Sequence, residues 1–472
     1  MCYKFLKYRE IITLKVSKKC FTKKAGSLTL IHLKTKKRSL HMLREKQIKV
    51  TQNTQVKFHQ FMYKFKEEFS LPEFKAIRDI TRGILTSGSV IVNKIALGLN
   101  EKTTLKKTAE RCYRNLKHHT LHEKLSMQMI QQQCHNFDHE TLIIVDESDI
   151  VKRSATKMEG LSKVRDGSTG STHNLGYDLL NIVAYRKQTN GYQMLPVSSD
   201  LYSDSLEADS ISNILHDRID DITISSNNKG VFVFDRGFDS RVLIEHLVGN
   251  ANSFIIRGVG KRNVIIDNKE VSFSKVCKAI SLRYNHPGVS NDQWFECGIK
   301  KVAIRTSPHP KKNAPSVDVW LVKACHRNNK DKRRGYFYFL CDFPDQNLSE
   351  AEIVRKALSY YRLRWLIEQA HKQVKQDFGW EEMQLLTYTG LKNLNSLLWL
   401  ALCFLYGQKD YIIKWAEAFP RQFGQYRKHL LKLFDFVYSA LMSAVKMVFS
   451  MWSKYSFTPR DDEPLQMRVK LK

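Results

Sequence analysis

Two short and wholly apolar runs in this chain each end on an aspartate. Residues 141–146 read Thr-Leu-Ile-Ile-Val-Asp, and residues 230–235 read Gly-Val-Phe-Val-Phe-Asp. Apolar runs of this length are typical of strands that are buried on both faces in the middle of a sheet. The two runs therefore predict two central strands, with Asp146 and Asp235 at or near their carboxyl ends.

The segments around these runs alternate between strand and helix patterns. Strands are expected at 179–186, 192–198 and 253–257, and helices at 204–222 and 241–248. Thr189-Asn190-Gly191 is a strong hairpin signal between the first two of these strands. The resulting order, β-β-β-α-β-α-β, predicts an α/β fold: a mixed sheet with helices packed on both faces.

The regions on either side of this alternation have other patterns. Residues 258–340 hold 17 Lys or Arg against six acids, a balance of 17 − 6 = +11, and short β-rich runs broken by segments such as Ser307–Pro310. They predict a basic β insertion. Successive amphipathic helices are expected over 58–121, a largely apolar helix over 391–407, an amphipathic helix over 427–452 and a loose polar tail over 458–472. The apolar run 397–406 is shorter than the roughly 20 residues that cross a bilayer, so no membrane span is expected.

Charge points to the class of partner. The net charge of +30 predicts a polyanionic partner, of which nucleic acid is the usual one. Residues 1–50 hold 15 Lys or Arg against two acids, 15 − 2 = +13. Three interpretations of this segment stay open: a disordered nucleic-acid-binding arm, a small poorly specified lobe, or translation from upstream of the true start, with Met42 and Met62 as alternative starts.

The location of the protein is inferred from its cysteines and its first residues. The nine cysteines contain no C-x-x-C pair, which favours reduced thiols over disulfides or a zinc module. The start shows no apolar segment long enough for a signal peptide. We therefore expect a cytoplasmic protein.

A third acidic candidate lies on a predicted helix. The segment 349–379 contains no Gly or Pro before Phe378-Gly379 and reads as one long helix with an acidic first turn and a glycine stop. Tyr361, Arg364, Glu368 and Lys375 are 3, 4 and 7 residues apart. On a continuous helix they share an arc of about 60°. The plain alternative is a solvated face with helical ion pairs.

Together the three carboxylates predict a metal centre. Asp146 and Asp235 lie where α/β sheets usually place their sites, and Glu368 is a natural third ligand. Such hard oxygen ligands suit two Mg²⁺ ions, with Mn²⁺ as a substitute, in phosphoryl transfer. The alternative is that the strand-end aspartates only cap helices or form turns.

Neighbouring polar residues are expected to support this site. Asp149 is a rival first ligand, but three residues along a strand place it on the opposite face from Asp146. We expect Arg236 and Asp239 to support the loop after Asp235. The histidines, including His173 and His371, show no metal-ligand spacing and are expected to be surface or satisfied polar residues.

These segments carry a family resemblance. Asp235-Arg-Gly-Phe-Asp239 resembles the D-R-G-[FY]-D segment of bacterial insertion-sequence transposases of the DDE class. Tyr361-x2-Arg364-x3-Glu368-x6-Lys375 resembles the Y-R-E-K signature of one large subgroup of them without a spacing error, and Val145–Asp149 resembles that subgroup's first-aspartate segment.

The resemblance implies a fold, a reaction and partners. The fold is an RNase H-like core interrupted by a β insertion, and the reaction is cut-and-paste transposition at terminal inverted repeats, through a DNA hairpin with a flipped base. Asp146, Asp235 and Glu368 would bind two Mg²⁺ ions. The partners would be double-stranded element-end and target DNA and a second copy of the chain, in the nucleoid.

The resemblance also implies roles outside the metal centre. Tyr361, Arg364 and Lys375 would contact phosphates, and Trp365 would lie near the flipped base. Relatives stack that base on a tryptophan of the last insertion strand. This chain has Phe337 there instead, and Trp320 on an earlier strand, and we expect both to be strand packing.

The resemblance also implies a division of the chain into six regions. They are a basic N-terminal segment (residues 1–50), a helical DNA-binding domain (51–138), the first part of the catalytic core (139–257), a basic β-rich insertion (258–345), the second part of the core with the glutamate helix (346–410) and a C-terminal helical region for dimerisation (411–472).

Two other hypotheses stay open. One is a catalytically inactive transposase-derived DNA-binding protein, and the other is a metal-dependent nuclease that cleaves without joining strands.

Overall fold

The structure is a computed structural model, and it describes residues 24–164, 174–188, 191–207, 210–288, 293–306, 315–328, 335–344, 346–423 and 437–451. The predictions for residues 1–23, for the turn at 189–190, for His173, for Ser307–Pro310 and for the tail lie outside the described residues. The predicted hairpin strands and central strands all lie within them.

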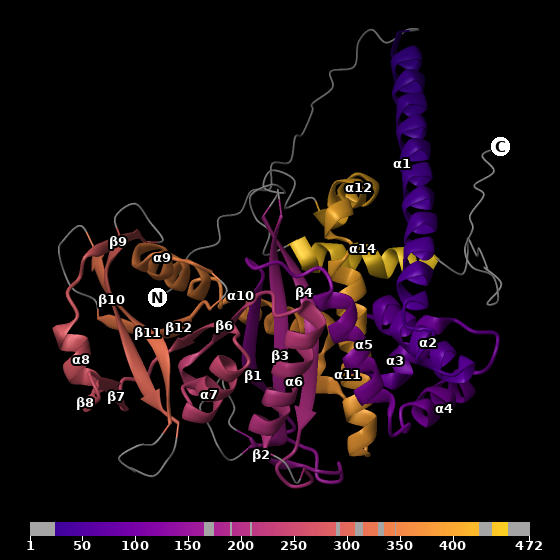
Figure 1. Ribbon diagram of the computed structural model, residues 1–472. Helices are drawn as coiled ribbons and strands as arrows, with labels where there is room; N and C mark the ends of the chain where they lie inside the picture. Colours follow the sequence, from indigo (N-terminus) through magenta and orange to yellow (C-terminus); the bar gives the residue numbers. More distant parts are fainter. Residues whose placement is uncertain are drawn as a thin grey trace.

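Over the ranges given above, five strands of one 12-stranded mixed sheet form the centre of the molecule (Figure 1). They lie in the order β4-β3-β1-β5-β6, antiparallel from β4 to β1 and parallel from β1 to β6. Their bounds are β1 Leu142–Val151, β3 Asn174–Gln188, β4 Gly191–Tyr202, β5 Val231–Phe234 and β6 Ser253–Arg257. Helix α6 (Ile211–Ser226) connects β4 to β5, and helix α7 (Arg241–Gly249) connects β5 to β6. The predicted α/β fold class is confirmed.

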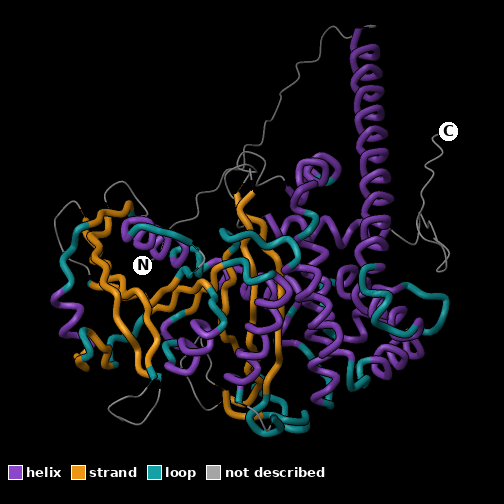
Figure 2. Tube along the Cα trace, viewed as in Figure 1, coloured by secondary structure: helices purple, strands orange, loops and turns teal. Residues whose placement is uncertain are grey.

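The β insertion extends this sheet instead of forming a separate one (Figure 2). Its last strand, β12, pairs antiparallel with β6, and the sheet continues through β11, β10 and β7 to β8. The bounds of the remaining strands and of the short helix among them are β2 Ser162–Val164, β7 Asn263–Ile266, β8 Lys269–Ser272, α8 Phe273–Ala279, β9 Tyr284–Pro287, β10 Gln293–Arg305, β11 Ser316–Asn328 and β12 Tyr336–Asp342. Because β12 lies directly beside β6, the insertion borders the edge where Asp235 lies.

Alternate residues of the central strands belong to two separate hydrophobic cores, as the two-residue period of a strand requires. Leu142 and Ile144 pack with the helices of the N- and C-terminal regions, while Ile143 and Val145 pack with α6 and α7. The helices of the first core include α1 Lys24–Tyr63, α2 Leu71–Ser87, α3 Val92–Leu99, α4 Leu105–Asn115, α5 Leu121–Cys134, α11 Tyr388–Tyr406, α12 Ile412–Ala418, α13 Pro420–Phe423 and α14 Val437–Met451. No helix in the described part of the chain is long and apolar enough to cross a membrane.

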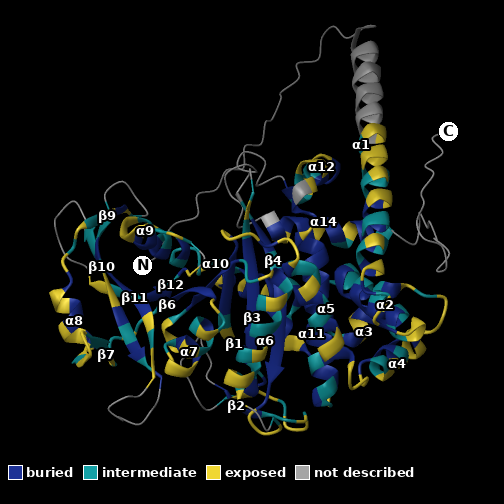
Figure 3. Ribbon diagram, in the orientation of Figure 1, coloured by how far each residue is buried: buried dark blue, intermediate teal, exposed yellow. Residues whose placement is uncertain are grey.

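The first helix includes part of the basic segment for which the sequence left three interpretations open. α1 runs unbroken from Lys24 to Tyr63 and projects from the body (Figure 1). Along its described side chains, exposure gives way to burial toward the body, where Phe58 and Met62 are fully buried (Figure 3). A helix satisfies its own backbone hydrogen bonds, so this one extends beyond the part that packs.

The prediction of one continuous helix over 349–379 is wrong in the middle. The ends agree with it, since Ser349 and Glu352 form a capping box and Gly379 ends the segment at φ 66°. Between them α9 (Glu350–Tyr361) stops, a turn follows at 362–365, and α10 (Leu366–Gln373) continues into a π-helical turn over 374–378. Backbone bonds in the turn join residues three apart, a tighter winding than an α-helix has.

Tertiary contacts determine this interruption, because the segment carries no Gly or Pro there. The Tyr185 hydroxyl of β3 donates to the Leu366 carbonyl at 2.9 Å, which fixes the start of α10. Two smaller differences concern ends of helices. Helix α6 begins at Ile211 instead of residue 204, and the part of the expected helix 427–452 that the structure describes is α14.

Candidate active site

The two strand aspartates lie side by side. β1 and β5 are parallel neighbours in which Val145 is level with Phe234, so the residues that follow, Asp146 and Asp235, are also level. The expected strand end is confirmed for Asp235, which directly follows β5, but it is wrong for Asp146, because β1 continues to Val151. The continuation of β1 places Asp149 on the opposite face from Asp146, as expected.

Glu368 reaches the same edge of the sheet from α10, and Arg364 lies between it and Asp146. The Arg364 Nη2 atom is 2.7 Å from Glu368 Oε1, and its Nη1 atom is 3.6 Å from Asp146 Oδ1. Two side chains of this group are largely covered, with Asp146 17% and Arg364 16% exposed, while Glu368 is 59% exposed. The broken helix makes this possible, because Arg364 lies in the turn and Glu368 lies in the first turn of α10.

The Asp146 carboxyl group is buried and lies near two other carboxylates, and both conditions raise its pKa. Burial raises its pKa to about 7, and the negative charges of Asp235 and Glu368 act in the same direction. The Arg364 guanidinium opposes this rise without cancelling it. For Arg364 itself, burial acts to lower the pKa, but the charges of Asp146 and Asp235 raise it overall. The site therefore holds more negative charge than one arginine balances.

Asp235 has structural contacts as well. Its Oδ1 atom accepts from the Arg236 backbone N–H at 2.5 Å, where it caps the short 3₁₀ turn Arg236–Phe238, and from the Tyr361 hydroxyl at 3.2 Å. Asp235 therefore does cap a short helix, as the alternative interpretation proposed, and it also contacts Tyr361. Asp239 supports the loop as expected, since it accepts from the Val259 N–H at 2.7 Å and pairs with Arg262.

The other residues of the Y-R-E-K pattern are less close to the carboxylates. The Lys375 ammonium pairs with Glu381 at 2.9 Å, and its place in the π-helical turn removes it from the single helix face that the spacing predicted. Trp365 is 42% exposed in the turn. The structure thus brings Tyr361, Arg364 and Glu368 to the aspartates, with Lys375 at the margin.

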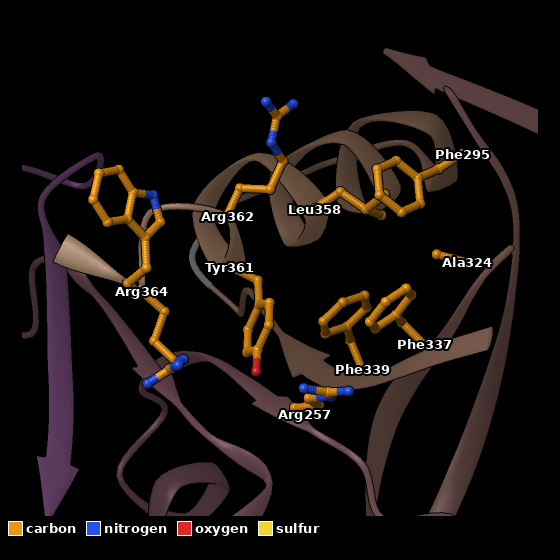
Figure 4. A pocket seen from close by; sticks show the side chains of 10 residues that line it. Arg257, Phe295, Ala324, Phe337, Phe339, Leu358, Tyr361, Arg362 and Arg364 are labelled. Atoms are coloured by element: carbon orange, nitrogen blue, oxygen red, sulfur yellow. The ribbon is translucent and has the colours of Figure 1, made fainter. Parts of the chain in front are cut away.

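A cavity of about 270 Å³ opens beside this cluster, between α9 and the insertion strands (Figure 4). Figure 4 shows the Tyr361 hydroxyl pointing toward the guanidinium groups of Arg257 and Arg364, with the rings of Phe337 and Phe339 alongside and Arg362 pointing away. Its lining is mostly apolar and includes three arginines: Arg257, Phe295, Ala324, Phe337, Phe339, Leu358, Tyr361, Arg362, Arg364 and Trp365. Trp320 is not among these residues.

Two residues of this region were not identified from the sequence. Arg257 ends β6 and lies 5.2 Å from the centre of the Phe337 ring. His371 was expected to be a surface or satisfied polar residue, and that expectation is wrong. Its ring is buried, its Nδ1 atom lies 4.0 Å from Asp146 Oδ2, and its Nε2 atom has no hydrogen-bond partner among the described residues. Burial lowers its pKa to about 3, with help from Lys375 and Arg364. The only sequence signal was its position three residues after Glu368.

The donor chemistry of the carboxylates fits a hard divalent cation, and their mutual repulsion favours one. Their present arrangement is not a closed ligand set. Within the described ranges, no three His, Cys, Asp or Glu side chains form a group ready to hold a metal ion, since Arg364 stands between Asp146 and Glu368.

Comparison with known proteins identifies the family. A search of curated proteins finds no match. Among solved structures, the chain is similar to a piggyBac transposase synaptic complex with hairpin DNA, at 10% identity and a TM-score of 0.35, over 84% of this chain and 77% of that one. Residues 140–404, more than half of the chain and including all three carboxylates, match the family described as Transposase DDE domain. This chain belongs to that transposase family.

Proposed function

We propose that this member of the transposase family catalyses cut-and-paste transposition of a bacterial insertion sequence, and that it belongs to the Y-R-E-K subgroup. The observation that carries the proposal is the convergence of Asp146, Asp235 and Glu368 at one edge of the sheet, with Tyr361 and Arg364 in direct contact with them. Nicking of an element end and joining of its 3′ end to target DNA are both phosphoryl transfers, which one acidic centre can serve in turn.

Asp146, Asp235 and Glu368 would hold two Mg²⁺ ions, with Mn²⁺ as a substitute. Bound there, the ions would polarise the phosphodiester and activate the attacking oxygen. The protein's own contribution is to supply three carboxylates from three separate elements and to shield Asp146 from bulk water. The largely buried Asp146 side chain, flanked by two like charges, supports this assignment because a cation relieves that repulsion.

Tyr361, Arg364 and Lys375 would contact phosphates near the cleaved bond. Tyr361 can donate its hydroxyl proton, which it now gives to Asp235, and Arg364 offers a planar fork that suits a phosphate. The cavity beside them would take an extrahelical base during a hairpin step. Phe337 and Trp365 both line this cavity, so the base could stack on either ring. For Phe337 this role would go beyond the strand packing that we expected.

The remaining regions would bind DNA and join protomers. We assign residues 51–138 and the insertion, residues 258–345, to double-stranded DNA because the chain carries a net charge of +30. Residues 411–472 would join two copies in the nucleoid. A salt titration checks the DNA assignment: affinity for duplex DNA should fall steeply between low and physiological salt.

The deciding experiment uses purified protein, Mg²⁺ and linear DNA that bears the terminal repeats flanking the gene. The wild type should nick and join ends, whereas Asp146→Asn, Asp235→Asn and Glu368→Gln should each lose at least about a thousandfold in rate, because each removes a ligand that supports charge in the transition state. DNA binding should persist in all three.

Each alternative predicts a different result from this experiment. Cutting at full rate by any of the three variants would contradict the assigned centre. Cleavage without strand joining by the wild type would favour the nuclease, and binding without cleavage would favour the inactive relative. A matched control is Asp149→Asn, which alters a nearby aspartate on the opposite face of β1 and should keep its activity.

A further inference from the structure

Arg364 now holds the carboxylate oxygens that a metal would need. Its two terminal nitrogens serve different partners, one directed at Asp146 and the other at Glu368. A guanidinium has a rigid planar fork, so a single side chain can bridge two carboxylates in this way. The 2.7 Å contact with Glu368 Oε1 uses an oxygen lone pair that a cation would otherwise take. Arginine and metal therefore compete for the same atoms.

The same arginine also faces the cavity where we place DNA. Arg364 lines that cavity together with Tyr361 and Trp365, and Figure 4 shows the guanidinium groups of Arg364 and Arg257 on opposite sides of the Tyr361 hydroxyl. A phosphate at this position is a bidentate partner for a guanidinium. One group can thus pair with the protein's own carboxylates or with a phosphate of the DNA.

The local structure allows this exchange. Arg364 belongs to the turn between α9 and α10, so its side chain can change partners without unwinding either helix. Its stronger contact is with Glu368, which is 59% exposed, and ion pairs at exposed positions contribute only about 0–1 kcal/mol. A charge-assisted bond to a phosphate can therefore replace it.

From this geometry we propose that Arg364 is a latch that couples metal binding to DNA binding. Without DNA its guanidinium occupies Asp146 and Glu368 and weakens metal binding, and a phosphate of the DNA draws it away and releases both carboxylates. The proposal rests on the proposed function, since it assumes the same metal centre. By linkage, metal and DNA each strengthen binding of the other by the same factor. The device would keep the protein from cutting before its DNA is in place.

The test measures Mn²⁺ binding to the full-length protein without DNA, by electron paramagnetic resonance of the free ion. Arg364→Gln should bind Mn²⁺ about tenfold more tightly than wild type, a typical size for coupling between two sites. The matched control is Arg362→Gln, which removes the same charge two residues away, where the guanidinium donates to the Pro287 carbonyl. It should stay within about twofold of wild type because an exposed charge acts weakly.

A second variant separates the bridge from the charge. Arg364→Lys keeps the positive charge, but a single ammonium lacks the fork that spans both carboxylates, so its Mn²⁺ affinity should lie between those of wild type and Arg364→Gln. Thermal unfolding of each variant verifies that it is folded. In a matched DNA-binding titration, Mn²⁺ should strengthen DNA binding by wild type more than by Arg364→Gln.

The outcomes distinguish the latch from the metal centre. Equal or weaker Mn²⁺ binding by Arg364→Gln overturns the latch and leaves the centre intact, provided that Asp146→Asn still abolishes Mg²⁺-dependent cutting. If the double variant Asp146→Asn/Arg364→Gln binds Mn²⁺ as tightly as Arg364→Gln, the ion lies elsewhere, and both the latch and the proposed metal centre are wrong.

Discussion

Two aspartates of the same sheet have similar neighbours and opposite properties. Asp146 on β1 faces an arginine at 3.6 Å and a histidine at 4.0 Å. Asp200 on β4 also faces an arginine and a histidine, Arg218 at 2.8 Å and His122 at 3.3 Å. The pKa of Asp146 is raised to about 7, whereas that of Asp200 lies well below its usual value.

The difference lies in how completely each carboxylate is hydrogen-bonded. Burial by itself would raise the pKa of Asp200, but Arg218 donates to it from both Nε and Nη2, and the Ser198 hydroxyl donates at 2.5 Å. His122 in turn contacts Ser396 at 2.6 Å, which ties α5, β4, α6 and α11 together. Asp146 has more distant neighbours, the Arg364 guanidinium at 3.6 Å and the His371 ring at 4.0 Å, and the like charges of Asp235 and Glu368 raise its pKa. A satisfied buried charge holds the fold together, and an unsatisfied one is available for chemistry.

The largest expected effect is on stability. Asp200→Asn should lower the free energy of unfolding by about 3–5 kcal/mol, because it leaves the buried Arg218 charge without a full partner. Asp146→Asn should leave that free energy unchanged or raise it, since it removes one of three neighbouring negative charges. Urea denaturation of both variants measures the contrast. An equal loss of unfolding free energy in the two variants would contradict the different roles that we assign to Asp200 and Asp146.

The second expected effect is on the free energy of unfolding at low pH. A lowered pKa in the folded state means that Asp200 contributes stability above its unfolded pKa of about 4, and that this contribution is lost as the pH falls below it. The wild type should therefore lose more unfolding free energy between pH 6 and pH 3 than Asp200→Asn does. Denaturation curves at the two pH values measure it. A similar loss in both proteins would mean that Asp200 is not strongly paired.

The smallest expected effect concerns the two histidines. His122→Ala should cost about 1–3 kcal/mol more than His371→Ala, because both leave a similar cavity but only His122 makes two close polar contacts. The His371 Nε2 atom has no hydrogen-bond partner among the described residues, so little is lost there. Thermal unfolding of the pair gives the difference, and a greater loss for His371→Ala would contradict this account of the site.

Much of the architecture could be predicted from local pattern. The apolar runs before Asp146 and Asp235 predicted buried strands. The two aspartates lie side by side because β1 and β5 are parallel and paired in register, although β1 continues past Asp146 to Val151. The ends of the segment 349–379 were also predictable, because a capping box and a glycine stop act within one turn of the chain.

Other features depended on contacts that no local pattern encodes. The break between α9 and α10 contains no Gly or Pro, and a bond from Tyr185, 181 residues earlier, fixes its far side. The pairing of β12 with β6, which extends the core sheet into the insertion, is equally non-local. His371 was misjudged because only the folded chain brings it to Asp146.

The sequence by itself therefore predicted the order of strands and helices in the core, the three candidate carboxylates and the spacing of Tyr361, Arg364 and Glu368, because periodicity and capping act over a few residues. Only the tertiary structure decided what those side chains contact. It placed Arg364 between Asp146 and Glu368, and it surrounded Asp200 with close partners while leaving Asp146 with more distant ones. The physical reason is that the pKa of a carboxylate depends on burial and on charges that the fold brings from distant parts of the chain.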